Sequence, residues 1–353
     1  MAVITMVGAG MMGSALCVPL VDAGHQVRLV GTPLDESIIT QLRRDGVHPK
    51  MGLALPGGIK AFSSSEIERA MDGVEIIGVG VSSAGVDWCG RALAPFARPD
   101  VPLVMITKGL SWDGSGLRIL PDVLRDHFPE TSRESIAPAV VAGPCIAGEL
   151  ARRVPSAVVL TGRDVGVLGR LSALMRTPYY FPFVDPDVLG VETCAALKNA
   201  YAMGIAFATG QHEARGGQPG SIAMHNAESA VFAQALFEMQ RIIALMGGSG
   251  ASVVGLAGAG DLDVTTNGGR TGRFGKWLGT GLSREAAIAK MEGATLECLE
   301  ILDQLRKAVR AWQLAGNLGP EELPLLRHMQ AVALDGAAVD LPYARFFGGL
   351  PAS

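Results

Sequence analysis

Short apolar segments alternate with helical patterns through the first half of the chain. Buried strands are predicted at 3–7, 26–30, 59–62, 75–79, 101–106, 139–142, 156–160 and 179–184. A helix is predicted at 11–23, and Ser65 with Glu68 forms a capping-box pattern for a short helix. Strands that alternate with helices indicate a mainly parallel sheet, so the first half predicts an α/β domain.

After about residue 187 the strand signals stop and helical periodicity takes over. Helices are predicted at 191–210, 221–245, 285–314 and 321–335, the last two expected only to pack. A glycine-rich gap at 216–220 separates the first two, and a polar, glycine-rich loop is predicted at 255–270. The chain is therefore predicted to form two domains, an α/β domain at 1–187 and an all-helical domain at 188–353.

Three glycines follow the first predicted strand directly and open the first predicted helix. In this context Gly8 permits a tight turn, Gly10 lets a pyrophosphate approach the backbone, and Gly13 lets helix and strand pack closely. The α/β domain is therefore predicted to be Rossmann-like and to bind a dinucleotide. The end of the second strand, at 30–33, supplies neither the acidic residue that binds an NAD ribose nor an arginine for NADP. Asp35 comes slightly late, so the preference stays open.

Two lysines stand out against apolar surroundings. Lys198 and Asn199 form a polar pair in the middle of the helix predicted at 191–210. If that helix is central, the partly dry ammonium could polarise a carbonyl or donate a proton; a lysine on the wet side of an ordinary helix is the alternative. Lys108 follows a strand, at the sheet edge where doubly wound folds bind ligands, with an exposed loop lysine as the alternative.

The predicted loop at 255–270 combines glycines with Thr265, Asn267 and Arg270. Backbone N–H groups and a guanidinium suit a phosphate, so an anion site is predicted here, with a solvated loop between helices as the alternative. The histidines, including His225 and His328, show no metal-ligand spacing, and no metal site is expected.

Composition narrows the class of protein. The chain has 353 residues, 48% of them hydrophobic, and a net charge of −4 without a long basic run, which argues for a large core and against nucleic-acid binding. Five scattered cysteines without a C-x-x-C pair fit a reducing cytosol. The uncharged segment 2–21 lacks a preceding basic region and is broken by glycines and Pro19, so neither a signal peptide nor a membrane span is expected.

Five sequence blocks together resemble the NAD(P)-dependent glycerol-3-phosphate dehydrogenase family over roughly residues 1 to 300. They are Gly8-x-Gly10-x-x-Gly13, Thr107–Lys108–Gly109, Gly143–Pro144-x-x-Ala147-x-Glu149, Glu192-x-x-x-x-Leu197–Lys198–Asn199 and Gly255–Leu256–Ala257–Gly258-x-Gly260–Asp261–Leu262. The resemblance implies a Rossmann-like N-terminal domain, an all-helical C-terminal domain and usually a homodimer. It implies interconversion of dihydroxyacetone phosphate and sn-glycerol 3-phosphate with NAD or NADP.

The resemblance also implies roles for individual residues. Lys198 is implied as the proton donor and Lys108 as a second active-site lysine, with Asp261 and Thr265 at further catalytic positions. The residues implied to bind substrate are Asn199, Arg270 and Thr271. Those implied to bind cofactor are Gly8, Gly10, Met11, Met12, Gly13, Thr32, Val81, Lys108, Ala147 and Arg270.

Some positions depart from the family pattern. Thr271 stands where an asparagine is usual, and Thr32 stands where many bacterial members carry a basic residue, which weakens the case for NADP. These departures leave room for a paralogue acting on another phosphorylated ketose or polyol. Opine-type dehydrogenases and ketopantoate reductase share the layout and are further alternatives, and a non-catalytic NAD(P)H-binding sensor is the alternative of another class.

Overall fold

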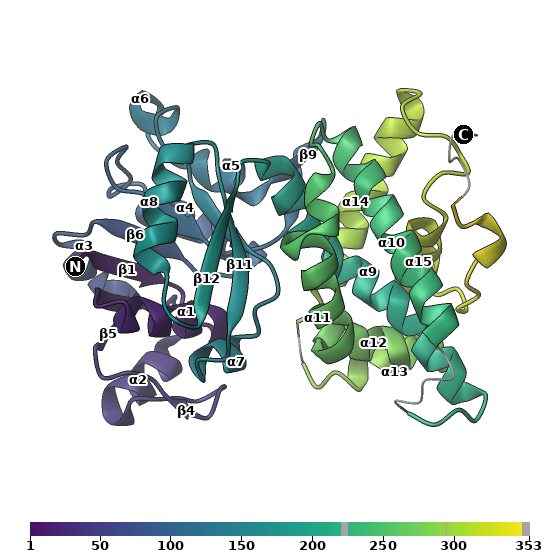
Figure 1. Ribbon diagram of the computed structural model, residues 1–353, viewed down its shortest axis with the longest axis horizontal. Helices are drawn as coiled ribbons and strands as arrows, with labels where there is room; N and C mark the ends of the chain where they lie inside the picture. The colour runs from purple at the N-terminus through teal and green to yellow at the C-terminus, as the bar shows by residue number, and fades with distance from the viewer. Residues whose placement is uncertain (220–224, 294, 348–353) are drawn as a thin grey trace. The chain divides into compact units, whose positions relative to one another are not determined.

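The computed structural model describes residues 1–219, 225–293 and 295–347, and it divides into two compact units. The first unit comprises Met1–Lys108 and Ile119–Val188, and the second comprises Gly109–Arg118 and the chain from Leu189 onward. Figure 1 labels many elements of both.

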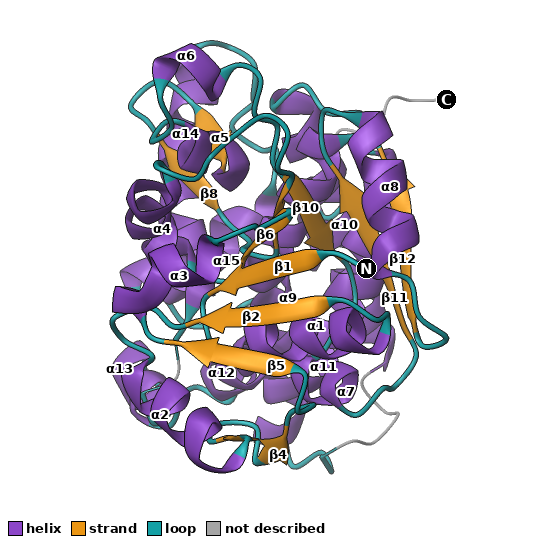
Figure 2. Cartoon of the chain, turned by 90° about the vertical axis from the view of Figure 1, so that its left-hand side faces the viewer, coloured by secondary structure: helices purple, strands orange, loops and turns teal. Residues whose placement is uncertain are grey.

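An eight-stranded sheet forms the centre of the first unit. Its strands are β1 (Val3–Val7), β2 (Gln26–Val30), β5 (Ile59–Phe62), β6 (Ile76–Val79), β7 (Leu103–Met105), β10 (Ala139–Ala142), β11 (Ser156–Thr161) and β12 (Tyr180–Asp185). Their order is β12-β11-β10-β7-β6-β1-β2-β5, and only β10 and β11 pair antiparallel. From β5 to β10 this is the strand order of a Rossmann fold; β1, β2 and β5 lie side by side in Figure 2. The predicted strands and fold class are confirmed.

Helices flank the sheet, and two short hairpins form separate two-stranded sheets. The helices of this unit are α1 (Met11–Asp22), α2 (Glu36–Asp45), α3 (Ile67–Met71), α4 (Val86–Leu93), α5 (Leu120–Arg125), α6 (Glu130–Arg133), α7 (Ala147–Ala151) and α8 (Val165–Met175). Two antiparallel hairpins were not predicted. In one, β3 (Val47–His48) pairs with β4 (Leu53–Ala54), and in the other, β8 (Leu110–Trp112) pairs with β9 (Leu117–Ile119). Along β1, Ile4 and Met6 belong to one apolar cluster and Val7 to another. Both sheet faces are thus buried, which explains the continuous apolar strands.

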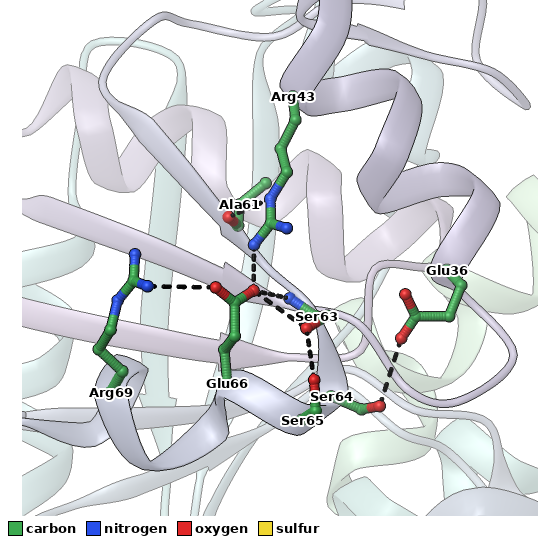
Figure 3. A network of polar contacts seen from close by, with 8 residues as sticks. All are labelled: Glu36, Arg43, Ala61, Ser63, Ser64, Ser65, Glu66 and Arg69. Atoms are coloured by element: carbon green, nitrogen blue, oxygen red, sulfur yellow. Dashed lines mark hydrogen bonds and ion pairs between the residues drawn. The ribbon is translucent and has the colours of Figure 1, made fainter.

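The predicted capping box is wrong by two residues. The pair is Ser63 and Glu66, not Ser65 and Glu68: the Glu66 carboxylate accepts the backbone N–H of Ser63 at 2.9 Å, and Ser64–Glu66 form a 3₁₀ turn before α3. β5 ends at Phe62, so Ser63 is the first residue that can cap the following turn. Figure 3 shows the polar network around this carboxylate.

Apart from β8 and the first residues of β9, the second unit is helical, and no strand follows β12 among the residues that the structure describes. Its helices are α9 (Val188–Ala214), α10 (His225–Leu245), α11 (Asp261–Gly268), α12 (Arg270–Gly279), α13 (Arg284–Ala289), α14 (Glu297–Leu314) and α15 (Pro324–Asp335). Within α9 every residue from 191 to 208 is buried, so this helix is central, as the functional interpretation of Lys198 requires. The start of the helix predicted at 221–245 lies outside the described residues. In the described ranges no helix is long and apolar enough to cross a bilayer.

The prediction of a loop at 255–270 is wrong, because most of this segment is helical. Leu256–Gly260 form a π-helical turn that leads into α11, and Arg270 begins α12. Two of the glycines there serve close packing. A Cβ on Gly258 would lie 2.1 Å from the Val253 carbonyl oxygen, and one on Gly269 would lie 2.3 Å from that of Thr265. These glycines therefore lie at tight junctions between helical segments and do not indicate an irregular loop.

A buried carboxylate connects α9 to its neighbours. Glu238 of α10 is 1% exposed and accepts the backbone N–H groups of Leu325 and Leu326 at 2.7 and 2.8 Å. It also accepts the hydroxyl of Tyr201, on α9, at 2.9 Å. These bonds satisfy N–H groups at the start of α15 that have no partner within the helix, and they fix three helices together.

Candidate cofactor and substrate sites

The turn after β1 is packed tightly at two of its three glycines and open at the third. Gly8 has φ +110°, and a Cβ on it would lie 2.6 Å from the carbonyl carbon of Gly80. A Cβ on Gly13 would lie 2.2 Å from the Gly8 oxygen, whereas one on Gly10 would meet nothing nearer than 4.0 Å. Packing within the protein therefore explains Gly8 and Gly13, and Gly10 fits a ligand that needs close access to the backbone.

The N-terminus of α1 suits a pyrophosphate. Gly10 is the N-cap residue, no side chain caps the helix, and its first turn contains no acidic residue. Met11 is 42% exposed and Met12 is half-buried. Backbone N–H groups and the positive end of the helix dipole are thus presented to an anion, and the residues present fit a dinucleotide.

Two side chains hold the peptide groups of Ala9 within this turn. The Oδ2 atom of Asp35 accepts the Ala9 N–H at 3.2 Å, as well as the N–H and hydroxyl of Thr32 at 2.9 and 2.8 Å. His48, fully buried, lies 3.1 Å from the Ala9 carbonyl oxygen through Nε2, and its Nδ1 accepts the N–H of Met51 at 3.3 Å. The proton therefore sits on Nε2, and burial lowers the pKa of His48. No sequence pattern pointed to His48, which lies in the unpredicted hairpin of β3 and β4.

The other predicted cofactor residues of this unit lie at or beyond the carboxyl ends of strands. Val81 follows β6, and its carbonyl accepts the hydroxyl of Thr107 at 2.8 Å. Lys108, half-buried, comes directly after Thr107 beyond the end of β7. Ala147 is the first residue of α7, which packs on α1. Parallel strands gather such positions at one edge, the edge that also carries the glycine turn.

In the second unit the predicted catalytic residues are in contact. The ammonium of Lys198 on α9 pairs with the carboxylate of Asp261, the first residue of α11, with side chains 10% and 2% exposed. Thr265 donates its hydroxyl to the Asp261 carbonyl oxygen at 2.6 Å. Burying either charge alone would be strongly unfavourable, and the pairing offsets that penalty. The protein thus maintains a lysine cation in a nearly dry position.

Two of the three predicted substrate residues meet at a carboxylate that the sequence did not single out. Asn199 donates through Nδ2 to Oε2 of Glu297 at 3.0 Å, and Nη2 of Arg270 lies 4.0 Å from Oε1 of the same residue. Thr271 is buried, with its hydroxyl hydrogen-bonded to the thiol of Cys298. Burial raises the pKa of that thiol to about 12.

A Rossmann-like unit with an open glycine turn, joined to a helical unit with a buried lysine–aspartate pair, is typical of a nicotinamide-dependent oxidoreductase. Residues 3–167 match the family model of the NAD-dependent glycerol-3-phosphate dehydrogenase N-terminus, and residues 187–341 match that of its C-terminus. The chain belongs to the NAD-dependent glycerol-3-phosphate dehydrogenase family, as the five sequence blocks predicted.

Relatives are similar over nearly the whole chain. The NADP(+)-dependent glycerol-3-phosphate dehydrogenase of Archaeoglobus fulgidus is 32% identical, covering 96% of this chain and 97% of its own. The glycerol-3-phosphate dehydrogenase [NAD(P)+] of Aeromonas salmonicida is 30% identical over 94% of this chain and 93% of its own. The crystal structure of glycerol-3-phosphate dehydrogenase from Coxiella burnetii superposes with a TM-score of 0.77 at 27% identity, covering 94% of each chain.

Proposed function

We propose that this protein interconverts dihydroxyacetone phosphate and sn-glycerol 3-phosphate with NAD or NADP. Residues 1–187 are proposed as the dinucleotide-binding domain and 188–353 as the substrate-binding domain. The observation that carries the proposal is the buried Lys198–Asp261 pair, next in sequence to an asparagine that shares a partner with Arg270. The two relatives described above, which are named as glycerol-3-phosphate dehydrogenases, also support the proposal. We further propose a cytoplasmic homodimer.

The chemistry follows from these groups. Bound NAD(P)H supplies a hydride to the ketone carbon, and negative charge develops on the ketone oxygen. Lys198 stabilises that charge and gives a proton to the oxygen, which becomes the hydroxyl of glycerol 3-phosphate. Asp261 orients the ammonium, and Thr265 fixes the backbone of Asp261. Lys108 is proposed as a second active-site cation.

The phosphate of the substrate is proposed to bind Asn199 and Arg270. A guanidinium and an amide N–H are suitable donors for phosphate oxygens, and Arg270 is half exposed, so it can reach a ligand. Thr271, buried beside Cys298, is proposed to support the first turn of α12 from behind.

Cofactor preference is proposed to favour NAD over NADP. The loop that follows β2 contains no basic residue, and Asp35 places a carboxylate there. Of the arginines on α2, Arg43 pairs with Glu66 and donates to the Ala61 carbonyl at 3.1 Å (Figure 3), and Arg44 pairs with Asp45. A 2′-phosphate at this edge would therefore meet a carboxylate and arginines already in ion pairs.

The assay that tests the proposal follows NADH and NADPH oxidation at 340 nm with dihydroxyacetone phosphate. We expect turnover with the phosphate ester only, and kcat/KM for NADH about tenfold above that for NADPH, as expected for one unfavourable phosphate–carboxylate contact. Unphosphorylated dihydroxyacetone is the control. Cofactor binding without turnover on any ketose phosphate would instead support the sensor, and faster turnover of a longer ketose phosphate would support the paralogue.

Gly10→Val is expected to weaken NADH binding at least about tenfold without lowering the melting temperature, because its side chain would occupy space that the protein leaves open. NADH titration by fluorescence and thermal denaturation measure the two quantities. Gly13→Ala is the matched comparison. Its Cβ would clash with the Gly8 oxygen, so it should lower the melting temperature. Unchanged NADH affinity in Gly10→Val would remove the pyrophosphate from this turn.

A further inference from the structure

The two residues proposed to bind the substrate phosphate are bridged by an anion of the protein itself. Glu297, in the first turn of α14, accepts the Nδ2–H of Asn199 at 3.0 Å and lies 4.0 Å from the Arg270 guanidinium. Its side chain is 33% exposed and that of Arg270 is 50% exposed, whereas Asn199 as a residue is 8% exposed. A carboxylate thus accepts a hydrogen bond from one of the donors that a phosphate would need and forms a long ion pair with the other.

The chemistry of these contacts sets up a competition. Asn199 and Arg270 come from different helices, α9 and α12, and Glu297 comes from a third. A phosphate dianion that approaches the two donors must share them with the carboxylate or displace it, and the two negative charges repel each other. A bare anion gains only these donors. A ketose phosphate also places its carbonyl oxygen on Lys198, so it has additional binding energy to overcome the repulsion.

We propose that Glu297 contacts the phosphate-binding donors as an internal anion and lowers the affinity of the site for phosphate, so that a phosphate without further contacts, such as inorganic phosphate, binds only weakly. This inference rests on the proposed function. Glu297 then lowers phosphate affinity. It also holds the side chains of Asn199 and Arg270 in position before substrate binds. A purely structural role would have the opposite sign, because losing a structural contact weakens ligand binding.

The test compares the full-length protein with its Glu297→Gln variant. The glutamine keeps an oxygen that can accept the Asn199 N–H and removes only the charge. We expect calorimetry to show inorganic phosphate and sn-glycerol 3-phosphate binding about fivefold more tightly to the variant, the effect of one partly exposed charge pair. In the NADH assay, KM for dihydroxyacetone phosphate should fall by a similar factor with kcat nearly unchanged.

Glu300→Gln is the matched control, since it removes the same charge from the same first turn of α14. Its phosphate affinity should stay within about twofold of wild type. Unchanged or weaker phosphate binding in Glu297→Gln, with an unchanged melting temperature, overturns the inference. If that variant unfolds more easily, Glu297→Asp, which keeps the negative charge, should bind inorganic phosphate about as weakly as wild type does, and tighter phosphate binding by Glu297→Asp would also overturn the inference. Absence of turnover on dihydroxyacetone phosphate in wild type refutes the proposed function, whatever the phosphate affinities are.

Discussion

Lys198→Ala is expected to lower kcat for dihydroxyacetone phosphate reduction by about a thousandfold, within the range for loss of a positioned general acid. The variant loses both the cation at the developing oxyanion and the proton that this oxygen receives. NADH binding should remain near the wild-type value, because the glycine turn belongs to the other unit. Stopped-flow reduction at 340 nm and NADH titration measure the two effects.

The controls must separate chemistry from stability. Lys198→Ala leaves the carboxylate of Asp261 buried without its ammonium, which is itself destabilising. The double variant Lys198→Ala with Asp261→Asn removes both charges and should be inactive while melting closer to wild type. Lys307→Ala removes an exposed lysine that pairs with Asp303 within α14 and should leave kcat unchanged. Turnover near the wild-type rate in the double variant would exclude Lys198 from the mechanism.

The α/β half could be predicted closely because its signals are local. Each central strand is an apolar run buried on both faces, so Val3–Val7 and Ala139–Ala142 were located to the residue. The glycine turn was likewise predictable, since a positive φ at Gly8 and the close approach of Gly13 to its oxygen both demand glycine. Two-residue strands such as Val47–His48 are too short for periodicity to show.

The substrate half was harder to predict because its contacts are distant in sequence. The ion pair of Lys198 with Asp261 spans 63 positions, and Asn199 and Glu297 are 98 positions apart. The apolar pattern of the helix singled out Lys198 and Asn199, and the resemblance added Asp261. No local pattern distinguishes Glu297 from any other acidic residue in a first helical turn. Glycines such as Gly258 suggested a loop because sequence alone does not separate packing glycines from turn glycines.

Arg270→Ala is expected to raise KM for dihydroxyacetone phosphate about thirtyfold with a much smaller change in kcat, the effect of losing a charge-assisted contact to phosphate. Arg270 begins α12 with its side chain half exposed, so truncation removes the guanidinium without opening the core. Initial-rate kinetics at saturating NADH give KM and kcat separately.

The matched control is Arg273→Ala, one turn further along α12 and exposed, which removes the same charge from the same helix. It should leave KM within about twofold of wild type. Because the resemblance also assigns Arg270 to the cofactor, KM for NADH must be measured in parallel. A rise only in the KM for NADH would assign Arg270 to cofactor binding. A rise only in the KM for the ketose phosphate would assign Arg270 to the substrate phosphate, beside Glu297. In the second case, combining Arg270→Ala with Glu297→Gln should recover less affinity than Glu297→Gln gains alone, because both residues act on one phosphate.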